Sequence, residues 1–143
     1  MNRNHINKRR AQGFTLMELL AVIIIIGVLA ATIGGRFLAQ TESAKAGAAR
    51  TEMGQLVQAL DLFKLEIGRY PTQQEGLEAL IKNPGGVQNW NGPYFRKDTV
   101  KDPWNNDYKY TNPGANNTPF DIKSLGADGK EGGEGPNADI VKS

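Results

Sequence analysis

A long apolar segment near the N-terminus constrains this chain more than any other feature. It extends over 20 residues, from Phe14 to Ile33, and contains one charged residue, Glu18. A helix needs about 20 residues to cross the hydrocarbon core of a bilayer, so the segment is long enough to span a membrane. Because a lone carboxylate is costly to bury there, Glu18 indicates either that the segment is more than an anchor or that the carboxylate has a partner.

The charge distribution points to an orientation in the membrane. Residues 1–13 carry four basic side chains and no acid, whereas the rest of the chain is net acidic, although the whole chain has a formal charge of +2. Basic flanks tend to stay on the cytoplasmic side of a membrane, so the part that follows the apolar segment is expected on the opposite side. Since the basic character belongs to this flank alone, we expect no nucleic-acid binding.

The composition argues against catalysis. The chain has no cysteine, and its single histidine is His5. Disulfides, thiolate metal sites and cysteine nucleophiles are therefore excluded. No serine or pair of carboxylates stands out as part of a catalytic motif. We therefore expect that the protein is not an enzyme.

The apolar segment allows three interpretations. A secretory signal peptide has the same order of basic and apolar residues, with small residues such as Val28 and Ala30 before a cleavage point. An ordinary N-terminal anchor would hold Glu18 close enough to the interface to reach water. The carboxylate disfavours both, because it opposes insertion of an apolar helix. The third interpretation depends on a motif.

That motif is Gly13-Phe14-Thr15-Leu16-Met17-Glu18, which follows the basic residues 8–10. It resembles the class III leader of type IV pilins and pseudopilins. The resemblance implies that a prepilin peptidase cleaves after Gly13 and methylates the new N-terminus, so that Phe14 becomes N-methylphenylalanine. The apolar helix is then retained in the mature protein. Glu18 corresponds to the fifth-position glutamate of this family, a residue used in assembly.

Cleavage before Phe14 would also provide a partner for Glu18. The new N-terminus is a cationic amine, and in a fibre of staggered subunits the carboxylate of one subunit can approach the amine of its neighbour. Removing one partner from such a buried ion pair typically costs about 3–5 kcal/mol. We therefore expect Glu18 to select the register of assembly.

A second helical pattern follows the apolar segment. Apolar residues recur there at spacings of three and four, which predicts one buried face of an amphipathic helix that packs on the chain's own globular part. Gly34-Gly35, where the family usually has a proline at the second position, should weaken the helix between the two patterns. Gly68 is expected to end it. The apolar positions are Ala49, Met53, Leu56, Leu60, Phe63 and Ile67.

The remaining sequence predicts a small head. Thr72 and Glu75 fit a capping box that opens a short helix. The pieces DYKYT and FDIKSL then favour two or three short antiparallel strands. We expect an α+β fold in which a long N-terminal helix packs on a small antiparallel sheet. The expected parts are a leader (1–13), a transmembrane and assembly helix (14–35) and a head (36–143).

Three segments of the head narrow the resemblance. LFKLEIGRYPTQQEGLEALI, NGPYFRKDTVKDPWNNDYKY and FDIKSLGADGKEGGEGPNADI resemble the G-type major pseudopilin of type II secretion systems. The resemblance implies a homopolymer, a helical fibre in the periplasm that supports export of folded proteins. It also implies minor pseudopilins and an inner-membrane assembly platform as partners. Before assembly, the subunit would span the inner membrane once, with its head in the periplasm.

Two other functions remain open at this point. The same architecture serves type IV pilins in adhesion, motility or DNA uptake, and a non-polymerising membrane-anchored calcium-binding module would share most of the features described above. The lack of cysteines favours secretion, because many pilins of the motility type have a C-terminal disulfide loop.

The last loop, LGADGKEGGEGPNAD, places carboxylates in a glycine-rich backbone. Carboxylate and carbonyl oxygens are the ligands that calcium prefers, although Lys130 and Gly132 stand where an EF-hand needs oxygen side chains. From the loop alone, a solvated acidic turn without metal is an equal alternative. The resemblance implies Ca²⁺ bound by the side chains of Asp128 and Asp139 and by the backbone carbonyls of Leu125 and Lys130.

The ligand set has one open position. Some relatives have two consecutive acids where this chain has Ala138-Asp139, so one ligand is missing or replaced. Asn137 and Glu134 both carry suitable oxygens, and the sequence does not distinguish between them.

Overall fold

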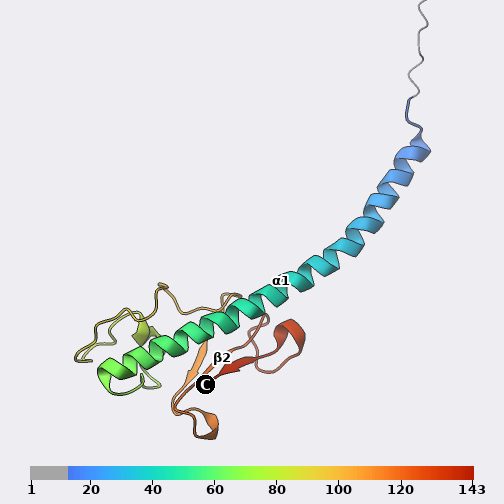
Figure 1. The fold of residues 1–143 in the computed structure, drawn as a ribbon. Coiled ribbons are helices and arrows are strands. Elements are labelled where there is room, and N and C mark those ends of the chain that lie inside the picture. The colour runs from blue at the N-terminus through green and yellow to red at the C-terminus, as the bar shows by residue number, and fades with distance from the viewer. Residues whose placement is uncertain (1–12) are drawn as a thin grey trace, which may run out of the picture. The chain divides into compact units, whose positions relative to one another are not determined.

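The computed structural model describes residues 13–143, without the side chains of residues 34–36 (Figure 1). These residues form two compact units, one ending at Leu38 and the other comprising Ala39–Ser143. The cleaved leader predicted for residues 1–13 therefore lies, except for Gly13, outside the described residues. In chain order the elements are α1 (Leu16–Ile67), the 3-10 turn η1 (Leu77–Leu80), β1 (Lys109–Thr111), η2 (Ala115–Asn117), β2 (Asp121–Ser124), η3 (Gly135–Asn137) and β3 (Ile140–Lys142).

Helix α1 carries the predicted apolar segment in its first half. Its most apolar window of 18 residues has a mean hydropathy of 2.7, and none of that window is buried within the chain. Ile23, for example, is 61% exposed. The backbone stays helical through Gly34 and Gly35. The first unit thus has the length and the exposed apolar surface of a membrane-spanning helix.

The second half of α1 supplies the core of the head. The predicted stripe is confirmed, because Met53, Leu56, Leu60 and Phe63 are fully buried. They belong to one cluster with inward-facing sheet residues such as Ile122. Burying such a side chain contributes roughly 1.5–3 kcal/mol relative to leaving it exposed. The head therefore has a hydrophobic core of its own.

The sheet has three antiparallel strands in the order β1-β2-β3. Tyr110 in β1 lies opposite Ile122 in β2, and Ser124 in β2 lies opposite Ile140 in β3. Tyr110, Ile122 and Ser124 point into the head and are buried. The observed fold is thus the predicted α+β arrangement.

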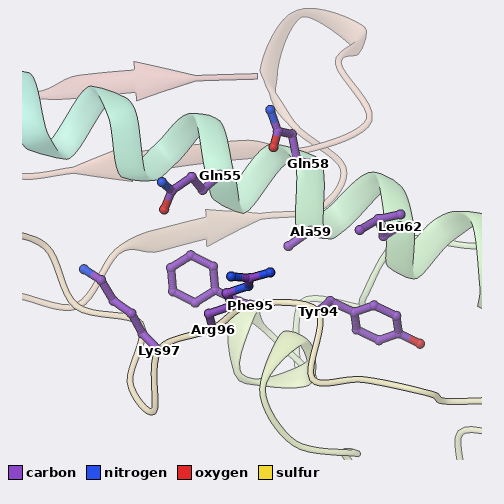
Figure 2. Close-up of a pocket in the computed structure, with 8 residues that line it drawn as sticks. All are labelled: Gln55, Gln58, Ala59, Leu62, Tyr94, Phe95, Arg96 and Lys97. Carbon is purple, nitrogen blue, oxygen red and sulfur yellow. The ribbon is translucent and has the colours of Figure 1, made fainter.

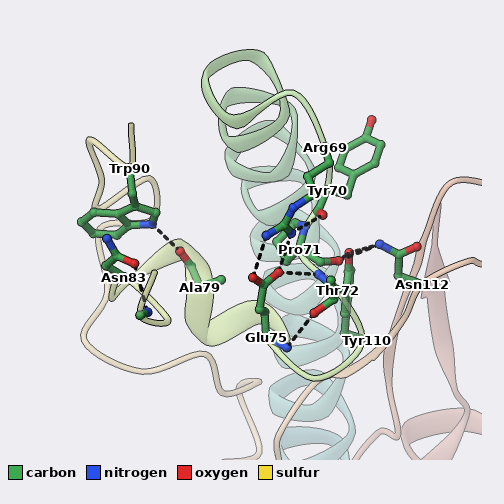
Figure 3. A network of polar contacts seen from close by, with 11 residues as sticks. Arg69, Tyr70, Pro71, Thr72, Glu75, Ala79, Asn83, Trp90, Tyr110 and Asn112 are labelled. Atoms are coloured by element: carbon green, nitrogen blue, oxygen red, sulfur yellow. Dashed lines mark hydrogen bonds and ion pairs between the residues drawn. The ribbon is translucent and has the colours of Figure 1, made fainter. Parts of the chain in front are cut away.

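Gly68 ends α1 as predicted. Its φ of 87° is accessible to glycine at little cost, and its N–H donates to the Lys64 carbonyl at 2.8 Å. The predicted capping box is also present, since the Thr72 N–H donates to Glu75 Oε2 at 2.7 Å and the Glu75 N–H donates to Thr72 Oγ1 at 3.2 Å (Figure 3). The short helix that this box was expected to open differs from the prediction, because it begins only at Leu77, as a 3-10 turn of four residues whose N-cap residue, Gly76, makes no side-chain cap hydrogen bond.

An ion pair closes this corner of the head. The Arg69 guanidinium contacts both oxygens of Glu75, at 2.6 and 2.8 Å (Figure 3). This contact, helped by the hydrogen bonds from Thr72, lowers the pKa of the Glu75 carboxyl to about 2. The Tyr110 hydroxyl donates to the Pro71 carbonyl at 2.9 Å and so ties the corner to β1.

A cavity of about 320 Å³ lies between α1 and the segment 94–97 (Figure 2). Its lining includes Gln55, Leu62 and Arg96. The neighbouring Lys97 ammonium contacts Glu52 Oε1 at 2.7 Å and thereby fastens this segment to α1.

Candidate functional site

The predicted cleavage point lies just before α1, in a segment without regular secondary structure. Gly13 and Phe14 are both exposed, and the Phe14 side chain is 83% accessible. Neither residue belongs to the helix, which begins at Leu16. A protease needs an accessible segment outside regular structure to bind the scissile bond, and residues 13 and 14 meet this requirement.

Glu18 caps the N-terminus of its own helix. Its Oε2 accepts the Thr15 N–H at 2.9 Å and the Thr15 hydroxyl at 3.2 Å, while the Glu18 N–H donates to Thr15 Oγ1 at 3.2 Å. This reciprocal pattern is a capping box, and a carboxylate there also interacts favourably with the helix dipole. The carboxylate therefore has hydrogen-bond partners within one subunit, but no opposite charge among them.

The partner of Glu18 in its own chain was not predicted from the sequence, which had led us to expect a partner in another subunit only. The signal was present, because a threonine followed three residues later by a glutamate is the usual sequence of a capping box. Gly13, Phe14, Thr15 and Glu18 surround an open concavity of about 450 Å³. A cationic group from another molecule can therefore approach the carboxylate.

The acidic loop between β2 and β3 is closed at its base. The Ala127 N–H donates to the Pro136 carbonyl at 3.0 Å, which brings the two ends of the loop together. Several of its glycines have positive φ, a conformation that other residues adopt only with strain. They are Gly126, Gly129, Gly132, Gly133 and Gly135.

The two predicted acidic ligands have different surroundings. Asp128 is exposed, and its Oδ1 accepts the Lys130 N–H at 3.1 Å. Asp139 Oδ2 accepts the Gly132 N–H at 3.1 Å and lies 3.6 Å from the Lys123 ammonium. Lys123 was not predicted at this site, because its approach to Asp139 depends on the register of β2 and β3.

One atom of this loop fits a bound cation. Asp139 Oδ1 is buried and has no hydrogen-bond partner within the described residues. Buried carboxylate oxygens are normally satisfied, and calcium coordinates such oxygens together with backbone carbonyls. Leu125, one of the two predicted carbonyl ligands, is buried at the start of the loop, whereas Lys130, the other, is exposed. The donor set thus fits calcium chemically.

Side chains alone do not make this loop a metal centre. In residues 13–143, no group of three or more His, Cys, Asp or Glu side chains is arranged to hold a metal ion. A calcium ion in this loop would therefore depend on backbone carbonyls and water in addition to Asp128 and Asp139.

Comparisons with known proteins match both parts of the chain. The family model for the type II secretion system protein G matches residues 36–143, and the model for the prokaryotic N-terminal methylation motif matches residues 8–34. Together they support the motif identified around Gly13 and the resemblance of the head.

Individual relatives agree with the family models. The type II secretion system core protein G of Pseudomonas aeruginosa is 43% identical over 136 residues, which cover 93% of this chain and 95% of the relative. The protein of the same name from Vibrio cholerae is 43% identical over 134 residues, covering 92% and 91% of the two chains.

The fold is also similar to that of a solved structure. The crystal structure of the major pseudopilin from the type 2 secretion system of enterohaemorrhagic Escherichia coli matches with a TM-score of 0.59 and 32% sequence identity. The match covers 73% of this chain and 90% of the solved chain. With the apolar helix, the methylation motif and the α+β head, these similarities show that the chain belongs to the type II secretion system protein G family, the major pseudopilins.

Proposed function

We propose that this chain is the major structural subunit of a type II secretion pseudopilus. Copies polymerise into a helical periplasmic fibre that supports export of folded proteins across the outer membrane, and the subunit catalyses no reaction. The observation that carries this proposal is the apolar first half of α1, which no other part of the described chain covers. Lipid covers this surface before assembly, and neighbouring subunits cover it afterwards.

Processing precedes assembly in this proposal. A prepilin peptidase cleaves after Gly13 and methylates Phe14, leaving α1 joined to the head. Until assembly, α1 spans the inner membrane once and the head lies in the periplasm, as the basic leader favours. The match of the methylation motif supports this order of events.

Assembly repeats one contact between different faces of two subunits. Such a heterologous contact produces an open helical fibre when its rotation does not close into a ring. The Phe14 amine of one subunit approaches the Glu18 carboxylate of the next, which exchanges the neutral Thr15 contacts for an ionic one. An unpaired charge left in the fibre core costs about 3–5 kcal/mol, so a register that separates this pair is disfavoured.

The proposed partners follow from the family. An inner-membrane assembly platform extracts and adds subunits, and minor pseudopilins belong to the same fibre. The names of the relatives, which place them in a secretion system, support these partners.

We further propose that the acidic loop binds a structural Ca²⁺. The ligands are the Asp128 and Asp139 side chains and the carbonyls of Leu125 and Lys130. The buried and unpartnered Asp139 Oδ1 supports this assignment. The ion neutralises the carboxylates and orders a loop whose own apolar content is low.

Complementation tests the main proposal. A strain that lacks the gene receives the wild type, Glu18→Gln, or Glu78→Gln as a control at an exposed carboxylate of the head. We expect wild type and Glu78→Gln to restore secretion of exported enzymes and cross-linked multimers. Glu18→Gln should restore neither, although mass spectrometry finds methylated Phe14 at its N-terminus.

The other functions predict different outcomes. Normal secretion in the deletion strain, with loss of adhesion, motility or DNA uptake, would identify a type IV pilin. Normal secretion without any multimer would favour a membrane-anchored calcium-binding module. A mature N-terminus near Ala31 would identify the apolar segment as a signal peptide.

A further inference from the structure

The segment 102–106 of the head forms a tight turn around a buried carboxylate. Asp102 is only 5% exposed, and its Oδ1 accepts the N–H groups of Trp104 at 3.0 Å and Asn106 at 2.8 Å. Backbone hydrogen bonds between Asp102 and Asn106 and between Asn105 and Asp102 close the turn. We call this segment the Asp102 turn. These bonds hold it in a single defined conformation.

One side of the Asp102 turn is fastened to α1. The Trp104 indole N–H donates to Glu42 Oε2 at 2.5 Å, across 62 positions of the sequence. The other oxygen of Glu42 contacts the Lys45 ammonium at 3.2 Å. The Trp104 hydrogen bond, followed by Lys45, holds the pKa of the Glu42 carboxyl below its ordinary value. Glu42 is therefore an ionised acceptor that joins the turn to the helix.

The other side of the Asp102 turn contacts the acidic loop. The Asn106 Nδ2 donates to the Gly126 carbonyl at 3.0 Å. Gly129 lies against the same amide, because a Cβ built on it would be 3.2 Å from Asn106 Oδ1. Gly126 and Gly129 flank Asp128, one of the proposed calcium ligands. The Asn106 side chain thus holds the start of the acidic loop by one hydrogen bond and leaves room for no side chain at Gly129 without a shift.

A second bond fixes the start of the loop. Asp102 Oδ2 accepts the hydroxyl of Ser124 at 2.7 Å, and Ser124, the last residue of β2, is fully buried. The Gly126 N–H in turn donates to Ser124 Oγ at 3.4 Å. The carboxylate that shapes the Asp102 turn therefore also positions the backbone from which the loop begins.

From these contacts we propose that Asn106 is a positioning residue for the acidic loop, and that the Asp102 turn links ion binding there to the contact between Trp104 and Glu42 on α1. The proposal deepens the proposed calcium function and rests on it. Asn106 does not coordinate the ion itself. Its amide bonds the Gly126 carbonyl on one side of Asp128 and lies against Gly129 on the other, and so keeps the backbone in the conformation that binding requires.

Calcium titration of the detergent-solubilised full chain tests the positioning role. Removing a residue that orients metal ligands typically weakens affinity by about 10–100-fold, and we expect about a tenfold loss for Asn106→Ala. Asn83→Ala is the matched control, because Asn83 Nδ2 also bonds a backbone carbonyl, that of Val87 at 3.3 Å, but in another loop. An unchanged calcium affinity in Asn106→Ala would overturn the proposal.

A second variant, Gly129→Ala, keeps the proposal testable if Asn106→Ala does not fold. Gly129→Ala crowds the Asn106 amide from the loop side and leaves the Asp102 turn intact; its φ of 65° adds local strain. We expect it to weaken calcium binding in the same direction as Asn106→Ala, with an unchanged far-ultraviolet circular dichroism spectrum. Full affinity in this variant would contradict a role for the contact between Asn106 and Gly129.

Tryptophan fluorescence tests the link to α1. The chain has two tryptophans, so Trp90→Phe leaves Trp104 as the only reporter. We expect calcium to change the Trp104 emission in this background, and Glu42→Gln to reduce that change while calcium affinity stays within twofold. If the protein binds calcium but its Trp104 emission does not change, the proposed link between the acidic loop and α1 is refuted. A chain that binds no calcium at all would instead remove the calcium proposal and this inference with it.

Discussion

The two halves of helix α1 carry similar apolar side chains in opposite surroundings. Ile23 in the first unit is 61% exposed, whereas Leu56 in the second unit is fully buried. The second half needs only one apolar stripe, because the rest of the head packs on that stripe alone. The first half is apolar on all sides, as expected for a helix surrounded by lipid or by other helices. One helix is therefore stabilised by the chain itself in one half and by its environment in the other.

The largest expected effect is a loss of stability that distinguishes substitutions in the two halves of α1. Leu56→Ala should lower the free energy of unfolding of the head by about 3 kcal/mol, because the substitution leaves a cavity in a packed core. Ile23→Ala should leave the stability of the head unchanged. Urea unfolding of the detergent-solubilised chain, followed by tryptophan fluorescence, measures both. Equal losses in the two variants would mean that the head depends on the first unit.

The proposed calcium ion should stabilise the second unit and leave the stability of the first unit unchanged. At a calcium concentration 100-fold above its dissociation constant, binding adds about 2.7 kcal/mol to the stability of the folded head. Asp128→Ala should therefore lower the melting temperature of the head only when calcium is present. If wild type and variant have equal melting temperatures both in calcium and in chelator, the proposed calcium site at Asp128 is wrong.

Acid should also weaken the head. The pKa of Glu75 is about 2 in the folded protein, below its ordinary 4.5, so its contribution is complete above about pH 4.5 and is lost as the pH falls towards 2. Because Arg69 is partly exposed and screened, we expect a loss of about 1.5 kcal/mol rather than the full value of the shift. Glu75→Gln should flatten this part of the pH profile of unfolding. A profile identical to that of the wild type would assign the acid sensitivity to other groups.

The smallest expected effect comes from removing the threonine of a capping box, a motif that both units contain. Thr72→Val should lower the stability of the head by about 1 kcal/mol, since it removes one side of a capping box. Thr15→Val removes the equivalent hydrogen bond at Glu18 and should leave the head unchanged. Instead, amide hydrogen exchange should accelerate in the first turn of α1. Loss of head stability in Thr15→Val would show that the two units unfold together.

Local patterns explain why much of the fold was predictable. The stripe from Ala49 to Phe63 is buried as predicted, because helical spacing depends only on nearby residues. Gly68 and the Thr72–Glu75 capping box are short-range signals for the same reason. Strand β3 was harder to predict, since its three residues pair with β2 across the acidic loop.

The candidate site was predictable only in part. The motif at Gly13 to Glu18 was recognisable in the sequence and lies within the matched N-terminal methylation motif, but the hydrogen bonds between Thr15 and Glu18 emerged only from the structure. The support of the acidic loop by Asn106 joins residues 20 positions apart, and no periodicity marks such a contact. The calcium ligands remain a prediction.

The capping box at the start of α1 has a consequence for the dynamics of the fibre. In a free subunit, Thr15 already donates two hydrogen bonds to the Glu18 carboxylate. Joining the proposed fibre would therefore replace these bonds with an ionic contact, whereas a carboxylate without partners would simply gain that contact. The net gain at this site is the difference between the two arrangements, and it is smaller than the ionic contact alone would give. The same difference reduces the free energy needed to remove a subunit, because a leaving subunit recovers its own cap. In the proposed fibre we therefore expect subunits at the end to exchange more readily with the membrane pool than the ionic contact alone would allow.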